Sequence, residues 1–283
     1  MSNPLRSAAF LVQRFMLGRR TLLAQVPEFD LELRVPADDA VGRHLYADRM
    51  HAPQVINLLA TRLQLEPDEL VFDIGASIGW YSLLLARIAP RGTSIHAFEP
   101  DPWARGLLQE NASRNRADAV TVVGAAVGED SGKAVLHRYG ARRRSGSGLF
   151  GVGGTAPLQI EMVSLDDYCR SHDLERQPVG FIKIGVEGFE YFALRGALET
   201  LGRCRTLLTE FSPARLEQLD VHPAGMLDLL VEVGFSPAVL RDGGVTPVDR
   251  ATLLASGSTH DVYWTRPVAA SGEVPIDPAA LAI

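Results

Sequence analysis

Residues 71–79 have the sequence Val-Phe-Asp-Ile-Gly-Ala-Ser-Ile-Gly, which carries the strongest structural signal in this chain of 283 residues. An apolar strand runs here into a glycine turn, and apolar residues at helical spacing follow from Trp80 to Ile88. Glycine is needed where backbone passes close to a ligand, and free N–H groups at the start of a helix then face that ligand. The segment therefore predicts a strand, a ligand-binding loop and a helix.

The segments on both sides of this loop continue the alternation of helices and strands. Short apolar runs predict strands at 70–72, 94–98, 120–123, 180–186, 206–211 and 261–265, with weaker ones at 135–138 and 160–163. Helical spacing separates most of them, at 80–88, around 107–111, at 187–198 and at 226–233. Right-handed crossovers then place helices on both faces of the sheet. We expect an α/β fold with a doubly wound, mostly parallel sheet of about seven strands, and ligands at the carboxyl ends of the strands.

The two ends of the chain differ from this pattern. Apolar residues between Phe10 and Leu17 have helical spacing, and we predict an N-terminal helical extension over residues 1–40. Docking of this amphipathic helix on the core, or on a second subunit of a homo-oligomer, is preferred to a membrane-surface anchor. Residues 41–266 are predicted to form the main domain, and the Ala- and Pro-rich residues 267–283 to form a flexible tail.

The composition excludes several protein classes. With 46% hydrophobic and 22% charged residues, the chain is typical of a globular protein. Its net charge of -6 argues against a general affinity for nucleic acid or anionic membranes, and no apolar run approaches the roughly 20 residues of a membrane-spanning helix. Cys169 and Cys204 follow no metal-ligand or redox spacing, so we expect no metal site and a reducing, cytoplasmic setting.

Two carboxylates indicate the chemistry of the ligand. Asp73 ends the strand before the glycine loop, where it would repel a pyrophosphate, so we expect a ligand that carries positive charge. S-adenosylmethionine fits, because it has an ammonium and a sulfonium group. Glu99 ends the next strand and would accept hydrogen bonds from both ribose hydroxyls. In the structural alternative Asp73 caps a helix and Glu99 lies in a turn; a nucleotide-dependent oxidoreductase is disfavoured because the loop lacks a G-x-G-x-x-G turn.

Five segments resemble the ordered blocks of the FkbM family of S-adenosylmethionine-dependent methyltransferases. They are Asp-Ile-Gly-Ala-Ser-Ile-Gly at 73–79, His-Ala-Phe-Glu-Pro at 96–100, Ala-Val-Gly at 126–128, Ser-Leu-Asp-Asp at 164–167 and Ile-Lys-Ile-Gly-Val-Glu-Gly-Phe-Glu at 182–190. The resemblance implies a Rossmann-like methyltransferase fold and an O-methyltransferase that acts on a hydroxyl of a small natural product or sugar-containing molecule. The cofactor-binding residues that we predict are Asp73, Gly75, Ala76, Ser77, Gly79, Glu99 and Ala126.

The sequence departs from the family pattern at two positions. Ser77 stands where the family usually has asparagine, which is a small change because either side chain hydrogen-bonds locally. Gly185 stands where the family usually has aspartate, and this removes a carboxylate from the predicted site. A homologue that binds S-adenosylmethionine with lost or altered catalysis is therefore the alternative function.

Methyl transfer to oxygen requires alignment of the two partners and removal of the hydroxyl proton. We predict Lys183, Glu187 and Glu210 as the catalytic residues, because they lie at the carboxyl ends of strands beside the loop. Lys183 interrupts an apolar strand and needs a partner, for which we predict Glu187; a purely structural Lys–Glu pair is the alternative. His137 is expected on the surface, and the Gly- and Ser-rich residues 139–157 are expected to form a lid.

Overall fold

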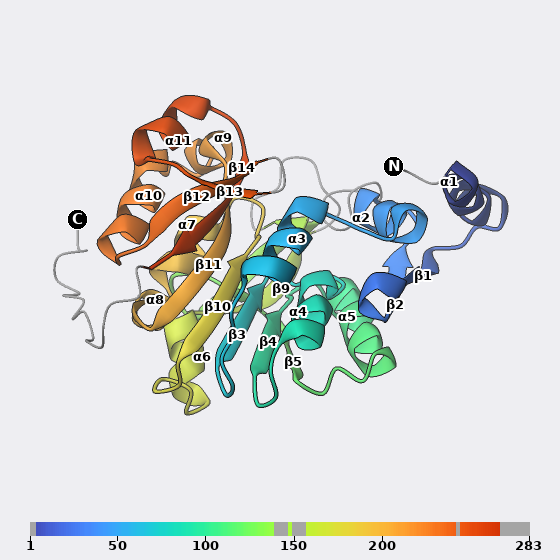
Figure 1. Ribbon diagram of the computed structural model, residues 1–283, viewed down its shortest axis with the longest axis horizontal. Helices are drawn as coiled ribbons and strands as arrows, with labels where there is room; N and C mark the ends of the chain where they lie inside the picture. Colours follow the sequence, from blue (N-terminus) through green and yellow to red (C-terminus); the bar gives the residue numbers. More distant parts are fainter. Residues whose placement is uncertain (1–3, 139–146, 149–156, 242–243, 267–283) are drawn as a thin grey trace.

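A central sheet of eight strands organises the computed structural model, which describes residues 4–138, 147–148, 157–241 and 244–266 (Figure 1). Along the sheet the strands are β13 (Gly244–Pro247), β12 (Ser236–Arg241), β14 (His260–Thr265), β11 (Cys204–Phe211), β10 (Val179–Ile184), β3 (Leu70–Ile74), β4 (Ser94–Phe98) and β5 (Val120–Val123). The five strands from β11 to β5 are parallel, and β14 pairs antiparallel with both β11 and β12. The predicted α/β fold with a mostly parallel sheet is confirmed; the unpredicted strands β12 and β13 form a hairpin at its edge.

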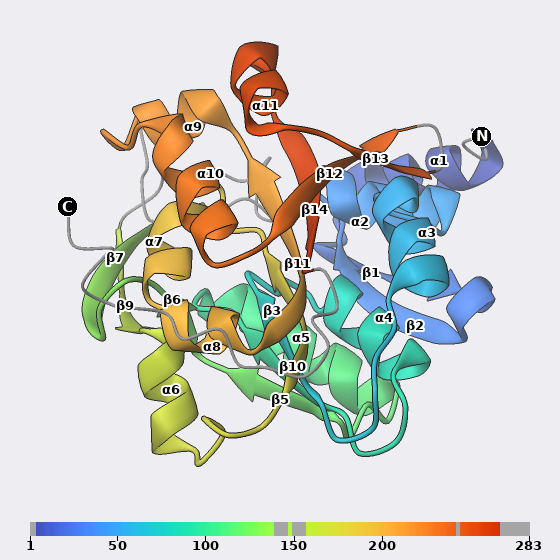
Figure 2. The same cartoon turned by 60° about the vertical axis from the view of Figure 1, so that its left-hand side comes forward.

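Helices cover both faces of this sheet (Figures 1 and 2). One face carries α3 (Pro53–Arg62), α4 (Trp80–Ile88) and α5 (Pro102–Arg114), and the other carries α6 (Leu165–Ser171), α7 (Glu190–Arg195), α8 (Leu198–Gly202) and α10 (Pro223–Glu232). The short helices α9 (Pro213–Glu217) and α11 (Arg250–Ser256) lie near α10. This is the doubly wound arrangement that the alternation of elements predicts.

The two faces have separate hydrophobic cores because successive strand residues point to opposite sides. In β3, Leu70, Phe72 and Ile74 pack with the helices of the α6 face, whereas Val71 belongs to the core beneath α3 and α4. In β10 the same alternation places Phe181 with Val71. Asp73 and Lys183 continue these two series, so their side chains lie on the α4 face of the sheet.

A second, smaller sheet stands beside the central one. Its strands are β6 (Ala125–Val127), β9 (Leu158–Val163), β7 (Gly132–Arg138) and β8 (Ser147–Gly148), in that order. The strands predicted at 135–138 and 160–163 exist as parts of β7 and β9, and they belong to this second sheet. They bury a small core of their own, made of Ala126, Leu136 and Ile160. Most of the predicted lid at 139–157 lies outside the described residues, and so does the predicted tail at 267–283.

The N-terminal extension is only partly helical. Helix α1 (Pro4–Leu11) continues into a π-helical turn at Val12–Met16, after which β1 (Thr21–Val26) and β2 (Leu31–Pro36) form an antiparallel hairpin. Alternate residues of β1 are buried, which is the pattern of a strand and not of a helix. A short helix, α2 (Ala40–Arg43), then leads into α3 through a second π-helical turn at His44–Asp48.

Candidate active site

Steric constraints fix the shape of the loop between β3 and α4. Gly75 has a φ angle of +77°, and a Cβ atom on it would lie 2.1 Å from the carbonyl oxygen of Gly185, so only glycine fits. Gly79 has a φ angle of +90°, and its Cβ would meet the Leu108 side chain at 2.4 Å. Ser77 also has a positive φ angle, +51°, a region that asparagine adopts more readily than most residues. The two glycines thus serve close packing within the protein.

The backbone donors of this loop are paired inside the protein. The N–H groups of Gly75 and Ala76 both donate to the carbonyl of Phe98, at 3.0 and 2.9 Å. The N–H of Ser77 donates to the carboxylate of Glu99 at 2.8 Å. The expectation that free N–H groups of the turn face a ligand is wrong for these three residues, because the end of β4 accepts their hydrogen bonds.

Glu99 is buried at the end of β4 but keeps acceptor capacity. Its Oε2 accepts the N–H of Ser77 and its Oε1 accepts the N–H of Asp101, both at 2.8 Å. Burial raises the pKa of Glu99 to about 7, and these two hydrogen bonds oppose that shift. A carboxylate has about four lone-pair positions, so roughly two of them remain for the hydroxyl groups of a ligand.

Lys183 is held by Asp73, its register partner on the neighbouring strand. Lys183 Nζ lies 3.2 Å from Asp73 Oδ1 and donates to the carbonyl of Gly75 at 2.9 Å. Asp73 Oδ2 accepts from Ser82 Oγ at 2.6 Å, and Asp73 has no exposed surface. The prediction that Glu187 is the partner of Lys183 was wrong. Residues opposite each other on adjacent parallel strands point to the same face, and that rule selects Asp73.

Arg215 of α9 holds the two glutamates that were predicted to be catalytic. Its Nη2 lies 2.9 Å from Glu187 Oε2, and its Nη1 lies 2.5 Å from Glu210 Oε2. The prediction of a helix that begins at Glu187 was wrong. The φ angle of Glu187 is +58°, and α7 begins only at Glu190. Burial raises the pKa of Glu210 to about 7, while Arg215 opposes the shift and nearby carboxylates reinforce it.

A pocket of about 330 Å³ opens at the carboxyl ends of the strands. Of the predicted site residues, it is lined by Gly75, Ala76, Ser77, Lys183, Glu187 and Glu210. The pocket lining does not include Asp73, Gly79, Glu99 or Ala126. Asp73 nevertheless pairs with the pocket residue Lys183, and Glu99 accepts a hydrogen bond from the N–H of Ser77 in the loop. Ala126 lies in β6 of the second sheet, and its contact with a cofactor stays a prediction.

Two residues of this pocket were missed in the sequence analysis. Asp261 is near the start of β14 and lies opposite Glu210 in the sheet register. Because β14 is antiparallel to β11, its first residues lie at the edge where the parallel strands end. The sequence pattern did not indicate the direction of this strand, so Asp261 was not predicted to lie at the site. His51 also lines the pocket, with its Nδ1 3.4 Å from Nδ1 of His44. Burial and neighbouring groups lower the pKa of His51 to about 4.

Gly185 leaves room beside the lysine. A Cβ atom at this position would lie 3.1 Å from both Cε and Nζ of Lys183, which is a close but adjustable contact with a flexible side chain. Its φ angle is outside the positive range that L residues avoid. A carboxylate at residue 185 would therefore reach the lysine ammonium without strain in the backbone.

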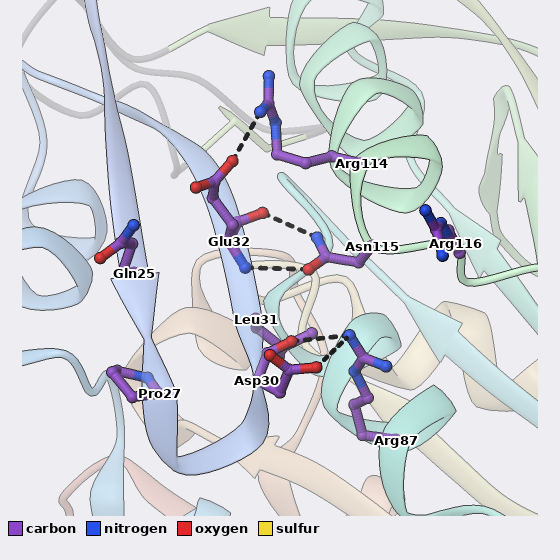
Figure 3. A pocket seen from close by; sticks show the side chains of 9 residues that line it. All are labelled: Gln25, Pro27, Asp30, Leu31, Glu32, Arg87, Arg114, Asn115 and Arg116. Carbon is purple, nitrogen blue, oxygen red and sulfur yellow. Dashed lines mark hydrogen bonds and ion pairs between the residues drawn. The ribbon is translucent and has the colours of Figure 1, made fainter.

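A larger pocket, of about 570 Å³, lies at the other end of the sheet (Figure 3). It is bounded by the β1–β2 hairpin and by the last turns of α4 and α5, which place it at the amino ends of the strands. Arg114 pairs there with Glu32 at 2.7 Å, and Arg87 Nη2 lies 3.5 Å from Asp30 Oδ2. These contacts tie the hairpin to the helices, and none of the predicted catalytic residues reaches this pocket.

Comparisons with known proteins identify the family of this chain. A family model described as the methyltransferase FkbM domain matches residues 73–237. The 31-O-demethyl-FK506 methyltransferase FkbM of Streptomyces tacrolimicus is 36% identical over 254 residues, which are 79% of this chain and 88% of that protein. The 2-O-methyltransferase NoeI of Sinorhizobium fredii is 27% identical over 192 residues, 62% of this chain and 75% of that protein.

Among solved structures, methyltransferase FkbM from Methylobacillus flagellatus has a TM-score of 0.46 and 18% identity, and the match covers 74% of this chain. This match spans about half of that chain, 47%. The family model covers more than half of the present sequence and includes the glycine loop, Glu99, Lys183 and Glu210. The chain therefore belongs to the FkbM methyltransferase family and is a methyltransferase.

Proposed function

We propose that this methyltransferase uses S-adenosylmethionine to methylate a hydroxyl oxygen of a small natural product or sugar-containing molecule. The observation that carries the proposal is the pocket in which the glycine loop, Lys183 and the carboxylate of Glu210 meet. The names of both relatives describe transfer to oxygen, which supports a hydroxyl acceptor.

The charges around the pocket suit a cationic cofactor. Three carboxylates, those of Glu187, Glu210 and Asp261, line the pocket. Arg215 pairs with the first two, and Lys183 is paired with the buried Asp73. Glu99 has lone pairs left for ribose hydroxyls, because each of its carboxylate oxygens accepts one hydrogen bond from a backbone N–H group. When bound, S-adenosylmethionine supplies a methyl group on a sulfonium.

The residues of the pocket have separate roles in this proposal. Glu210 accepts the proton of the substrate hydroxyl, because its raised pKa of about 7 makes it a stronger base than an exposed carboxylate. Arg215 fixes the orientation of Glu210. Lys183 positions the loop through its contacts with Asp73 and the carbonyl of Gly75.

The proposal is tested by calorimetric titration of the full chain with S-adenosylmethionine, followed by a screen of hydroxylated acceptors. Mass spectrometry then detects products that have gained one methyl group. Polyketides, sugars, glycolipids and hydroxylated peptides form the panel. Binding of the cofactor together with a methylated product supports the proposal, and absence of cofactor binding refutes it.

Replacing Glu99 with glutamine is expected to weaken cofactor binding by about 1–3 kcal/mol, the usual cost of a lost charge-assisted hydrogen bond. The amide NH₂ of glutamine would also face a backbone donor, since both carboxylate oxygens accept N–H groups. Titration calorimetry measures the affinity, and Glu110→Gln, a carboxylate paired with Arg34 in the N-terminal region, is the matched control. Equal affinities of Glu99→Gln and the wild type would remove Glu99 from the cofactor site.

Replacing Gly185 with aspartate separates an active enzyme from a homologue that only binds cofactor. We expect wild-type protein to transfer methyl groups and Gly185→Asp to change the single-turnover rate by less than about tenfold, since Glu210 already supplies a base. Gly185→Asn controls for the added volume near Lys183. A wild-type rate equal to that in solution, with a gain of several orders of magnitude in Gly185→Asp only, would show that catalysis has been lost.

A further inference from the structure

An exposed apolar surface lies on the N-terminal segment. Among the described residues nine large apolar side chains are exposed, and six of them fall between residues 5 and 17. These six, which we name the N-terminal apolar face, are Leu5, Leu11, Val12, Phe15, Met16 and Leu17. Phe15 is 69% exposed and Met16 is 79% exposed. Contiguous apolar surface of this kind marks an interaction site.

The segment that carries this face is attached to the rest of the protein through Phe10 of α1. Phe10 is buried, with its ring 5.7 Å from the ring of Tyr46. In both views α1 lies at the edge of the molecule (Figures 1 and 2), and the six side chains of the N-terminal apolar face are exposed. The core docking expected for the amphipathic helix is therefore achieved by Phe10, which leaves the N-terminal apolar face uncovered.

The charge of this segment is opposite to that of the rest of the chain. Residues 1–20 contain four arginines and no acidic residue, whereas the rest contains 24 basic and 34 acidic residues. Arg19 and Arg20 are exposed, and the guanidinium of Arg14 stacks 4.6 Å above the ring of Phe15. Apolar side chains next to arginines characterise helices that lie in the headgroup region of a membrane. The net charge of the whole chain is negative, so it does not indicate this local basic segment.

We propose that the N-terminal apolar face docks the protein on the surface of an anionic lipid bilayer. The apolar side chains enter the boundary between headgroups and acyl chains, and Arg19 and Arg20 contact lipid phosphates. A two-fold dimer through the same face would place two segments of charge +4 against each other, which disfavours a second copy as the occupant. No helix within the described ranges is long and apolar enough to cross a bilayer, so the contact is peripheral.

Cosedimentation of the full chain with lipid vesicles tests this surface, without cofactor or acceptor, so the result is independent of the proposed function. We expect partition onto phosphatidylcholine vesicles with about one quarter phosphatidylglycerol to exceed that onto pure phosphatidylcholine at least about tenfold. Rising salt should weaken the binding because it screens the arginines. The double variant Phe15→Ser/Met16→Ser should lose about tenfold or more in partition, and Val231→Ser, at an exposed valine on α10, should lose nothing.

A second variant and a measurement without lipid complete the test. Arg19→Gln/Arg20→Gln changes only exposed polar side chains and should reduce partition onto anionic vesicles about tenfold or more, with no change on phosphatidylcholine. Equal binding to both vesicle types, or wild-type binding by either double variant, would overturn the proposal. A dimer in sedimentation velocity that Phe15→Ser/Met16→Ser dissociates, without any vesicle binding, would assign the face to a second copy instead.

Discussion

Replacing Glu210 with glutamine is expected to lower kcat about 10²- to 10³-fold, the range that a general base contributes. Glutamine has the same shape, and its amide oxygen can still accept from Arg215, so the variant should stay folded. Burial raises the pKa of Glu210 to about 7. In the wild type kcat should therefore rise with pH through about 7, as the carboxyl group loses its proton, and this rise should be absent in Glu210→Gln.

The profile is measured with saturating cofactor and an acceptor found in the screen. Glu99 also has a pKa of about 7, but its ionisation acts on cofactor binding and hence on KM. Glu187→Gln is the matched control, because Glu187 shares Arg215 and we expect a much smaller change in kcat. If Glu210→Gln kept wild-type kcat while His51→Gln lost it, the proton acceptor would be the histidine that lines the pocket.

Replacing Lys183 with methionine is expected to lower the free energy of unfolding by about 3–5 kcal/mol, the usual cost of removing one partner of a buried ion pair. The variant leaves the carboxylate of Asp73, which has no exposed surface, without its cation. It also removes the donor to the carbonyl of Gly75, which ties the loop to β10. Such a loss is a large share of the stability of an ordinary domain.

Urea denaturation followed by circular dichroism measures this loss. The double variant Asp73→Asn/Lys183→Met should be more stable than Lys183→Met alone, because it removes the uncompensated charge. Asp73→Asn keeps an acceptor for Ser82 Oγ, so the cycle isolates the ion pair. Wild-type stability in Lys183→Met would show that the ammonium is not a structural partner of Asp73.

The alternation of elements predicted the fold, since strands buried on both faces leave a strong signal in a single sequence. The prediction paired Lys183 with Glu187 because the two residues are close along the chain, and it did not consider residues of the neighbouring strands. Register between β3 and β10 depends on contacts of residues far apart in sequence, and it places Asp73 opposite Lys183. The strands β7 and β9 were recognised, but the second sheet that they form was not predicted, because a local pattern indicates a strand without indicating which strands pair with it.

The sequence predicted some residues of the candidate site and not others. Glu187 and Glu210 line the pocket, because they lie at or just after the carboxyl ends of strands whose direction the alternation predicts. Asp261 was not predicted because it lies near the start of β14, which is antiparallel to β11. His51 comes from the segment before the first strand of the domain, and no periodicity links that segment to the pocket. Tertiary packing, through the hydrogen bond from Trp80 Nε1–H to the His51 carbonyl, places it there.

The position of β14 in the middle of the sheet constrains the order in which this enzyme matures on the ribosome. β14 is the last strand described, yet it inserts between β11 and β12 and buries Trp264, whose Nε1–H donates to Thr209. While the nascent chain lacks it, one side of β11 is an unpaired, apolar edge open to aggregation. The pocket wall at Asp261 is therefore completed only after β14 has left the exit tunnel, so shorter nascent chains lack a complete site.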